Sequence, residues 1–116
     1  MKNRYAAKLL FQFRIVTSGR TNKVRDIEER IIICAQENAE LAYKYSKSYG
    51  IESEYHYKND SGGKVFFEFI GVIDLLHLGN ETTKEEVWYD IRRAVNPMER
   101  RKKLVPAKHE LSAFRK

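Results

Sequence analysis

The most constraining feature of this sequence is a long alternation of apolar and polar residues near its start. Every odd position from 5 to 15 is apolar, namely Tyr5, Ala7, Leu9, Phe11, Phe13 and Ile15. The even positions between them include Lys8, Gln12 and Arg14. Because successive side chains of a strand point to opposite faces, this period of two predicts a long strand over residues 5–16 with one apolar and one mixed face.

A second strand is predicted shortly after the first. Residues 17–22 read Thr-Ser-Gly-Arg-Thr-Asn, which is typical of a turn or an exposed loop. Residues 24–35 then contain a β-branched run, Ile31 to Ile33, that ends on Cys34 and predicts another strand. Since the connection is short, the two strands should pair antiparallel.

The pattern changes to a helical period after residue 36. Small and apolar residues then recur three or four positions apart, as Ala39, Ala42, Tyr43, Ser46 and Tyr49. This spacing predicts an amphipathic helix over residues 36–49, and Gly50 follows where a helix often ends in a left-handed cap. Residues 51–58 alternate again and predict a strand. The run Asn-Asp-Ser-Gly-Gly at 59–63 predicts a hairpin turn into the next strand.

Residues 64–78 form a long apolar stretch rich in aromatic and β-branched side chains. A continuous helix over the same residues is the competing interpretation, but this composition and the preceding hairpin turn favour a strand. Gly71 in its middle predicts a bulge or a bend that curves the sheet.

The C-terminal third allows two interpretations at first. Thr82 and Glu85 have the spacing of a capping box and indicate the start of a helix. Residues 87–92 read Val-Trp-Tyr-Asp-Ile-Arg and have strand propensity, so we favour a final strand over 86–93. Asn96-Pro97 predicts a capped start for a short helix over 98–104. Residues 107–116 form a basic tail, with Leu111 and Phe114 as candidate anchors.

Together these segments predict an α+β fold. A single curved antiparallel sheet, in the order β-β-α-β-β plus a fifth strand, carries the 36–49 helix on one face and ends in a short helix. With 116 residues we expect one domain over 1–106 and the basic tail over 107–116. There is no apolar run long enough to span a bilayer and no signal-peptide pattern, so we expect a cytoplasmic protein.

Charge is distributed unevenly along the chain. Residues 1–25 contain seven basic residues and no acidic residue, and residues 92–116 contain nine basic and two acidic residues. Residues 26–91 contain six basic and fourteen acidic residues, so the net charge of +6 conceals an acidic middle. This pattern is either ordinary surface charge or a binding surface with separate basic and acidic patches.

Several short motifs resemble a known family. Residues 5–11 read Tyr-Ala-Ala-Lys-Leu-Leu-Phe, residues 28–31 Glu-Glu-Arg-Ile, and residues 69–75 Phe-Ile-Gly-Val-Ile-Asp-Leu. Their order over residues 4–78 resembles a bacterial family of domains of unknown function, DUF4288. The resemblance implies a small stand-alone α+β domain and no established activity. By genomic analogy with small proteins encoded near toxin genes, it also implies an immunity-type role.

Candidate catalytic and metal-binding residues are few. Cys34 lies in an apolar strand and is expected to be a buried structural thiol, and a single cysteine excludes an internal disulfide. His56, His77 and His109 lack the spacing of metal ligands, although His56 and His77 could be neighbours across the sheet. Six carboxylates could supply an acid/base pair for a hydrolase: Glu28, Glu29, Glu52, Glu54, Glu68 and Asp74. We expect these to be solvated partners of Lys and Arg, and hence no enzyme, no metal site and no cofactor.

Two binding functions remain as hypotheses. The leading one is a non-enzymatic immunity- or antitoxin-like inhibitor that occludes a toxin, because charged patches with aromatic residues suit a protein partner. Its candidate residues are Glu52, Glu54, Tyr55, His56, Tyr57, Glu85, Trp88, Tyr89 and Asp90, on two strands that could each be a sheet edge. The alternative is nucleic-acid binding through a basic patch of Arg92, Arg93, Arg100, Arg101, Lys102 and Lys103, assisted by Trp88, Tyr89 and Phe114.

Overall fold

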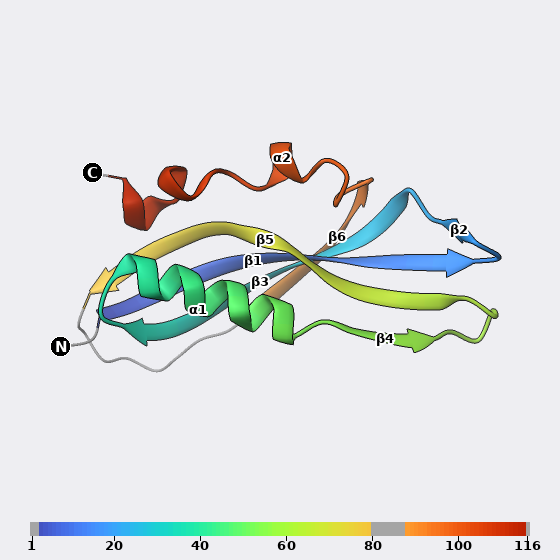
Figure 1. The fold of residues 1–116 in the computed structure, drawn as a ribbon, viewed down its shortest axis with the longest axis horizontal. Coiled ribbons are helices and arrows are strands. Elements are labelled where there is room, and N and C mark those ends of the chain that lie inside the picture. The colour runs from blue at the N-terminus through green and yellow to red at the C-terminus, as the bar shows by residue number, and fades with distance from the viewer. Residues whose placement is uncertain (1–2, 80–87, 116) are drawn as a thin grey trace.

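The computed structural model describes residues 3–79 and 88–115, and they form one sheet with one main helix (Figure 1). The strands are β1 (Asn3–Thr17), β2 (Arg20–Thr21), β3 (Val24–Gln36), β4 (Tyr55–Lys58), β5 (Lys64–Gly79) and β6 (Trp88–Val95). The helices are α1 (Ala39–Glu52), α2 (Arg101–Leu104) and two short 3-10 helices, η1 (Lys108–Glu110) and η2 (Ser112–Phe114). Among the described residues, no helix has the length and apolar character needed to cross a membrane.

The sheet confirms the predicted α+β class. Its strands lie in the order β4-β5-β1-β3-β6, with the short β2 paired to the end of β1, and every pairing is antiparallel. The long alternating strand β1 is therefore central, between β5 and β3. The predicted fifth strand is β6, which pairs with β3, so the strand interpretation of residues 88–93 is confirmed. Residues 86 and 87 lie outside the described part.

The alternation of β1 separates the two faces of the sheet. Its odd positions face α1 and build the main core, which contains Tyr5, Ala7, Leu9, Phe11, Ile32, Cys34, Ala42, Phe67, Val72, Leu75 and Leu111. We call the face of the sheet that carries these odd positions the helix-side face. Even positions point to the opposite face, where Leu10, Ile27 and Ile70 form a smaller core under the C-terminal segment.

The helix runs further than the sequence pattern predicts. Asn38 caps its start by accepting a hydrogen bond from the Leu41 N–H at 2.9 Å, and the helix continues to Glu52. The prediction that Gly50 ends the helix in a left-handed cap is wrong, because Gly50 is a buried helical residue. A Cβ atom there would lie 2.4 Å from the Phe69 ring, so glycine is needed for close approach of α1 to β5.

The strand predicted over residues 51–58 is correspondingly shorter. Ile51 and Glu52 complete α1, and β4 begins only at Tyr55. The carboxylate of Glu54 accepts a hydrogen bond from the Phe69 N–H at 3.0 Å, so a side chain takes the next backbone donor of β5. This bond limits β4 to four residues.

The long strand β5 is bent at the predicted place. Leu10 pairs with Gly71 while Phe11 pairs with Phe69, so Ile70 is an extra residue in the ladder. Such an irregularity is a β-bulge, which increases local twist. A Cβ atom on Gly71 would lie 2.8 Å from Val105, so the glycine also admits the C-terminal segment.

The short C-terminal helix starts later than predicted. Asn96 is not an N-cap, because its φ of 46° is left-handed and its N–H donates to the Lys23 carbonyl at 2.6 Å. Residues 97–100 form turns, and α2 covers only Arg101–Leu104. Beyond it, the segment expected as a basic tail packs on the fold. As predicted, Leu111 and Phe114 are anchors: Leu111 is 1 % exposed, and Phe114 packs against the main core.

The helix covers only part of an elongated sheet. The molecule measures 52 × 27 × 20 Å, whereas a helix the length of α1 extends about 21 Å at 1.5 Å per residue. In Figure 1, α1 and the C-terminal segment lie over one half of the sheet, and none of the described helices lies over the half containing β2 and β4. This uncovered half positions the candidate site.

Candidate functional site

The uncovered half of the helix-side face carries large exposed apolar side chains. Tyr55 and Tyr57 of β4 are 51 % and 47 % exposed, and on the other side of β1 Val24 of β3 and Val95 of β6 are exposed as well. A hollow of about 190 Å³ on the same face is lined by Phe13, Ile15, Asn22, Val24, Asp26 and Arg93. Tyr55 and Tyr57 lie side by side, with 6.2 Å between their ring centroids, and adjacent exposed apolar side chains of this size are typical of interaction sites in soluble domains.

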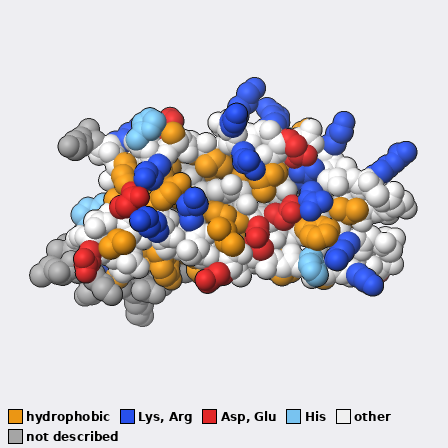
Figure 2. Space-filling model, viewed as in Figure 1, with side chains coloured by type: hydrophobic (Ala, Val, Ile, Leu, Met, Phe, Trp, Pro, Cys, Tyr) orange, Lys and Arg blue, Asp and Glu red, His pale blue; other side chains and the backbone are white. Residues whose placement is uncertain are grey.

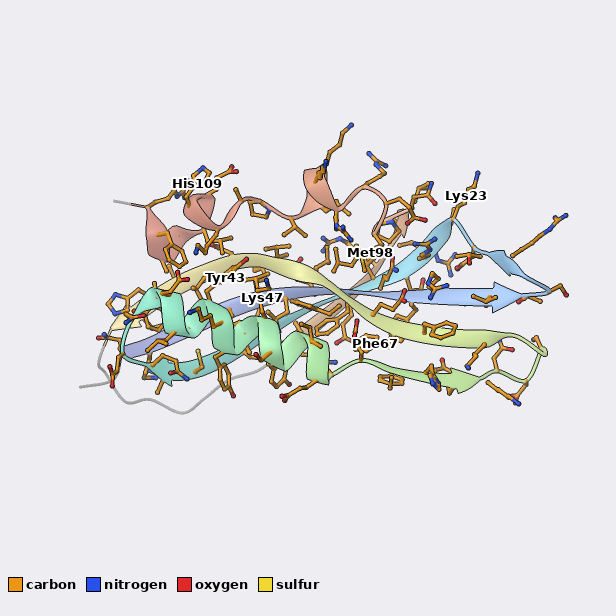
Figure 3. All side chains as sticks on the ribbon, in the orientation of Figure 1. Lys23, Tyr43, Lys47, Phe67, Met98 and His109 are labelled. Atoms are coloured by element: carbon orange, nitrogen blue, oxygen red, sulfur yellow. The ribbon has the colours of Figure 1, made fainter. Side chains whose placement is uncertain are left out.

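The two tyrosines rest on a rigid aromatic base. Tyr55 stacks on Phe67 with 4.9 Å between ring centroids, and Phe67 is 1 % exposed. Phe67 in turn contacts Phe11 at 4.6 Å and Phe13 at 4.9 Å. Figure 3 shows Phe67 near the end of α1, where the covered half of the sheet meets the uncovered half. We call Phe13, Tyr55, Tyr57 and Phe67 the aromatic surface.

An arginine borders the aromatic surface on the side of β3. The guanidinium carbon of Arg30 lies 4.8 Å from the centre of the Phe11 ring and 5.6 Å from that of Phe67, which is cation–π geometry. Glu28 holds this arginine by accepting a hydrogen bond from its Nε at 2.8 Å. The arginine is therefore oriented, and its charge is paired at the surface.

The opposite face of β4 is basic. His56 and Lys58 alternate with the tyrosines, and both are exposed. Lys58 lies directly opposite Lys64 of β5, and the ring of His56 contacts Phe66 edge-on at 5.7 Å. β4 therefore has an aromatic side and a basic side.

The predicted partner-binding residues are divided between two edges of the sheet. Because β4 and β6 are the outermost strands, the groups around Tyr55 and around Tyr89 lie at opposite edges. Glu52 is the last residue of α1, and Trp88 and Asp90 lie with Tyr89 on the backbone of β6. Glu85 lies outside the described residues.

The predicted basic patch lies toward the C-terminal segment and is partly paired. Arg92 donates to Glu29 at 2.9 Å, and Arg93 donates to Asp26 at 3.0 Å. The remaining four residues, Arg100, Arg101, Lys102 and Lys103, are exposed in the turn before α2 and in α2 itself. Figure 2 shows basic side chains along this margin of the molecule and at the far end of the strands.

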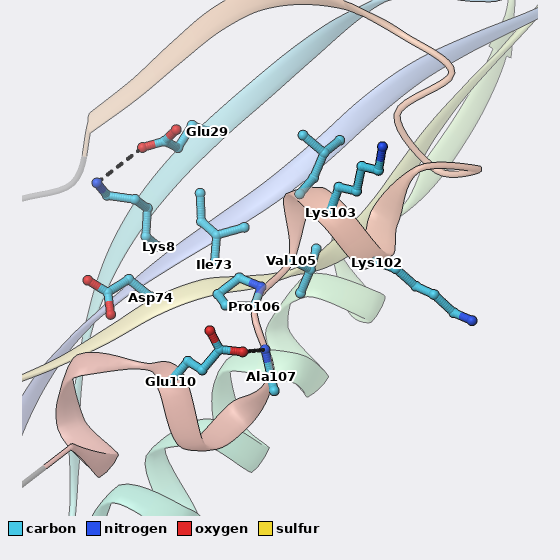
Figure 4. Close-up of a pocket in the computed structure, with 11 residues that line it drawn as sticks. Lys8, Glu29, Ile73, Asp74, Lys102, Lys103, Val105, Pro106, Ala107 and Glu110 are labelled. Atoms are coloured by element: carbon cyan, nitrogen blue, oxygen red, sulfur yellow. Dashed lines mark hydrogen bonds and ion pairs between the residues drawn. The ribbon is translucent and has the colours of Figure 1, made fainter.

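A groove of about 790 Å³ lies between α2 and the sheet, lined by residues that include Lys8, Glu29, Asp74, Lys102 and Glu110 (Figure 4). Each of its carboxylates already has a hydrogen-bond or ion-pair partner within the protein. Lys8 lies 3.3 Å from Glu29, Glu110 accepts from the Ala107 N–H, and Asp74 accepts from Ser112. Burial would raise the pKa of Glu29, but hydrogen bonds from Arg92 and Lys8 outweigh it and lower that pKa. The three carboxylates of the groove are thus held by partners within the protein.

A buried polar network between the sheet and the C-terminal segment was not found from the sequence. Arg25, 2 % exposed, donates to both carboxylate oxygens of Glu99 and to Gln12. Gln12 donates to Glu68, which Arg14 also contacts through two hydrogen bonds. The hydrogen bonds from Arg14 hold the pKa of Glu68 below its ordinary value of 4.5. In the sequence, only the polar even positions of β1 indicated such a network. The network attaches the turn at residues 97–100 to the sheet.

The remaining candidate chemistry is dispersed. Cys34 is buried, as predicted. His56 pairs with Phe66 and His77 with Tyr5, at opposite ends of β5, so the two histidines are not neighbours. Within residues 3–79 and 88–115, no three metal-ligating side chains lie together.

Comparison with known proteins gives one match. A family model described as "Domain of unknown function (DUF4288)" matches residues 4–88. No curated protein and no solved structure matches the chain. The matched range runs from the second residue of β1 to the first residue of β6, so the aromatic surface lies within it.

Proposed function

The chain belongs to the DUF4288 family of domains of unknown function, and from its half-covered sheet we propose a non-enzymatic interaction protein. In this proposal the domain binds a protein partner and occludes its active surface, as an immunity- or antitoxin-like inhibitor does. We place this role in the cytoplasm, where the lone thiol of Cys34 stays reduced.

The aromatic surface is the single observation that carries this proposal. Tyrosine and arginine are enriched among the residues that dominate binding energy at protein interfaces. Tyr55 and Tyr57 are half exposed, and their base, Phe67, is already packed. Ordering such rings on binding costs little conformational entropy, so exposed area on a rigid support favours affinity.

Charge around the aromatic surface also suits a protein partner. The neighbouring ion pairs, Glu28 with Arg30 and Asp26 with Arg93, leave little net charge on this face. A polar rim around an apolar centre is the usual anatomy of a protein interface.

We expect the double substitution Tyr55→Ser with Tyr57→Ser to reduce capture of the partner by at least about tenfold, because hot-spot residues each contribute about 2 kcal/mol or more. The tagged protein would be expressed in its native host and its partners quantified by mass spectrometry. Both side chains are about half exposed, so thermal unfolding of the variant should change little.

A matched control replaces two exposed apolar residues elsewhere. Leu41 and Leu104 are 40 % and 36 % exposed and belong to α1 and α2, so Leu41→Ser with Leu104→Ser should leave capture unchanged. Recovery of no stoichiometric protein by the wild type, or equal losses in both variants, would contradict the proposal.

A second candidate function, nucleic-acid binding, is favoured by one observation. Arg100, Lys102 and Lys103 are exposed, and within the described residues no carboxylate forms an ion pair with them. Lys and Arg neutralise phosphates, which makes such binding strongly salt-dependent. Oligonucleotide binding that weakens steeply with salt, and is lost on Arg100→Ala with Arg101→Ala, would support it. Phe114, however, packs against Tyr43 instead of offering a stacking surface.

A further inference from the structure

The outer edge of β4 is open. Among residues 3–79 and 88–115, β4 is the first strand in the sheet order and pairs only with β5, and all four of its residues are exposed. An open edge presents unpaired N–H and C=O groups to which another strand can bond. Protein partners commonly use such edges by adding a strand of their own.

The hairpin fixes which backbone groups face outward. The Asn59 N–H donates to the Gly63 carbonyl at 2.9 Å, and the register continues with Tyr57 opposite Val65 and Tyr55 opposite Phe67. In an antiparallel ladder, bonded pairs alternate with unbonded ones. Tyr55 and Tyr57 therefore bond to β5, and the backbone groups of His56 and Lys58 point away from it.

The two faces of β4 would favour different side chains on an added strand. On the helix-side face its residues would lie beside Tyr55 and Tyr57, and on the other face beside His56 and Lys58. Since side chains alternate in a strand, a matching segment alternates too. Its apolar residues would extend the aromatic surface.

Charge decides what the other residues should be. Lys58 and Lys64 are directly opposite each other in an unbonded pair, where side chains are closest. Like charges in this position are destabilising. Lys64 lies over Phe66 at 5.4 Å, and within the described residues neither lysine forms an ion pair with a carboxylate. An acidic side chain on an added strand would relieve this repulsion.

We propose that β4 accepts an extended segment of the protein partner whose residues alternate between acidic and apolar. This inference rests on the proposed function and names the chemistry of the partner. Nearby acidic residues do not oppose it, because the Glu54 carboxylate is bound to the Phe69 N–H. Glu52 and Asp60 lie beyond the two ends of β4.

A pair of substitutions at one position tests the inference. His56→Pro removes an outward N–H without removing a bond to β5, and proline is tolerated at an edge whose N–H faces solvent. His56→Ala removes the same imidazole but keeps the N–H. The probe is a short synthetic peptide that alternates glutamate with tyrosine, and its binding is followed by fluorescence anisotropy.

We expect His56→Pro to bind the peptide at least tenfold more weakly than His56→Ala, because the two variants lack the same imidazole and only the alanine variant keeps the outward N–H. A peptide with lysine in place of glutamate should bind poorly to the wild type and better to Lys58→Glu. If His56→Pro does not fold, two N-methylated peptides give the same test on the wild type. One peptide is methylated at its odd residues and the other at its even residues. Only one of the two sets of N–H groups can bond to β4, so only one of the two peptides should lose binding.

The inference would be overturned if the alanine and proline variants bound the peptide equally well. It would also be overturned if the two methylated peptides bound equally well, or if the wild type did not bind the unmodified peptide. Self-association of the chain that His56→Pro abolishes would overturn it too, because a second copy would then occupy the edge. Partner capture separates this failure from that of the proposed function. A partner lost on Tyr55→Ser with Tyr57→Ser but retained by His56→Pro supports the proposed function without strand addition.

Discussion

Replacing Leu111 with alanine is expected to lower the free energy of unfolding by about 2–5 kcal/mol, the usual cost of deleting a buried leucine side chain. Leu111 is 1 % exposed and belongs to the main core with Ala42 of α1 and Leu75 of β5. It lies beyond residue 88, where the family match ends. The C-terminal segment thus completes a core that the rest of the chain leaves open.

Leu104→Ala is the matched control for this prediction. It removes the same atoms from the same segment, but Leu104 is 36 % exposed. Equilibrium denaturation in urea should show a much smaller loss, since substitutions of exposed residues usually change stability by about 0.5 kcal/mol or less. Similar small losses in both variants would show that the C-terminal segment does not belong to the core.

Replacing Phe67 with alanine is expected to lower the free energy of unfolding by about 3–5 kcal/mol, the usual loss when a buried aromatic ring is removed and a cavity is left. Phe67 stacks on Phe11 and supports Tyr55, so its loss removes contacts on both sides of the ring. The substitution should also weaken partner capture, because Tyr55 loses its support. Denaturation and capture would be measured on the same preparation.

Phe66→Ala on the same strand is the control. Phe66 points to the opposite face and is only partly buried, with Arg14 and Lys64 over its ring. Its loss should cost clearly less stability and leave capture by the aromatic surface intact. Equal costs at the two positions would contradict the assignment of the two faces.

The fold class and the order of the elements along the chain could be predicted well because they depend on local signals, whereas the pairing of β1 with β5 joins distant segments and was not predicted. The period of two in β1 and the Asn-Asp-Ser-Gly-Gly turn identify strands and a hairpin without knowledge of what packs on them. The bulge near Gly71 and the anchors Leu111 and Phe114 were predicted on the same basis. Each of these features is visible within a few residues.

Boundaries failed where a distant contact decides them. Gly50 has the composition of a helix end, but it lies inside α1, and glycine is needed there because the Phe69 ring of another element leaves no room for a Cβ. Asn96-Pro97 has the composition of a helix start, but a bond to Lys23 holds Asn96 in a left-handed conformation instead. No local pattern contains either contact.

Many of the charges that are segregated along the chain form ion pairs with each other in the folded protein. Basic residues near both ends pair with carboxylates of the acidic middle, as Arg14 with Glu68, Arg93 with Asp26 and Lys108 with Glu40. The uneven pattern therefore joins strands and segments that are distant in sequence. What remains for a partner is more local: the aromatic surface on one face of β4, and the pair Lys58 and Lys64 on the opposite face.

Amide hydrogen exchange of the complex tests the central claim most directly. With the captured partner bound, exchange should slow at His56 and Lys58, whose N–H groups point outward, and change little at Tyr55 and Tyr57, which already bond to β5. This alternation is specific to strand addition. Slowed exchange confined to residues 100–103, with β4 unchanged, would contradict the account and place the partner on the basic patch.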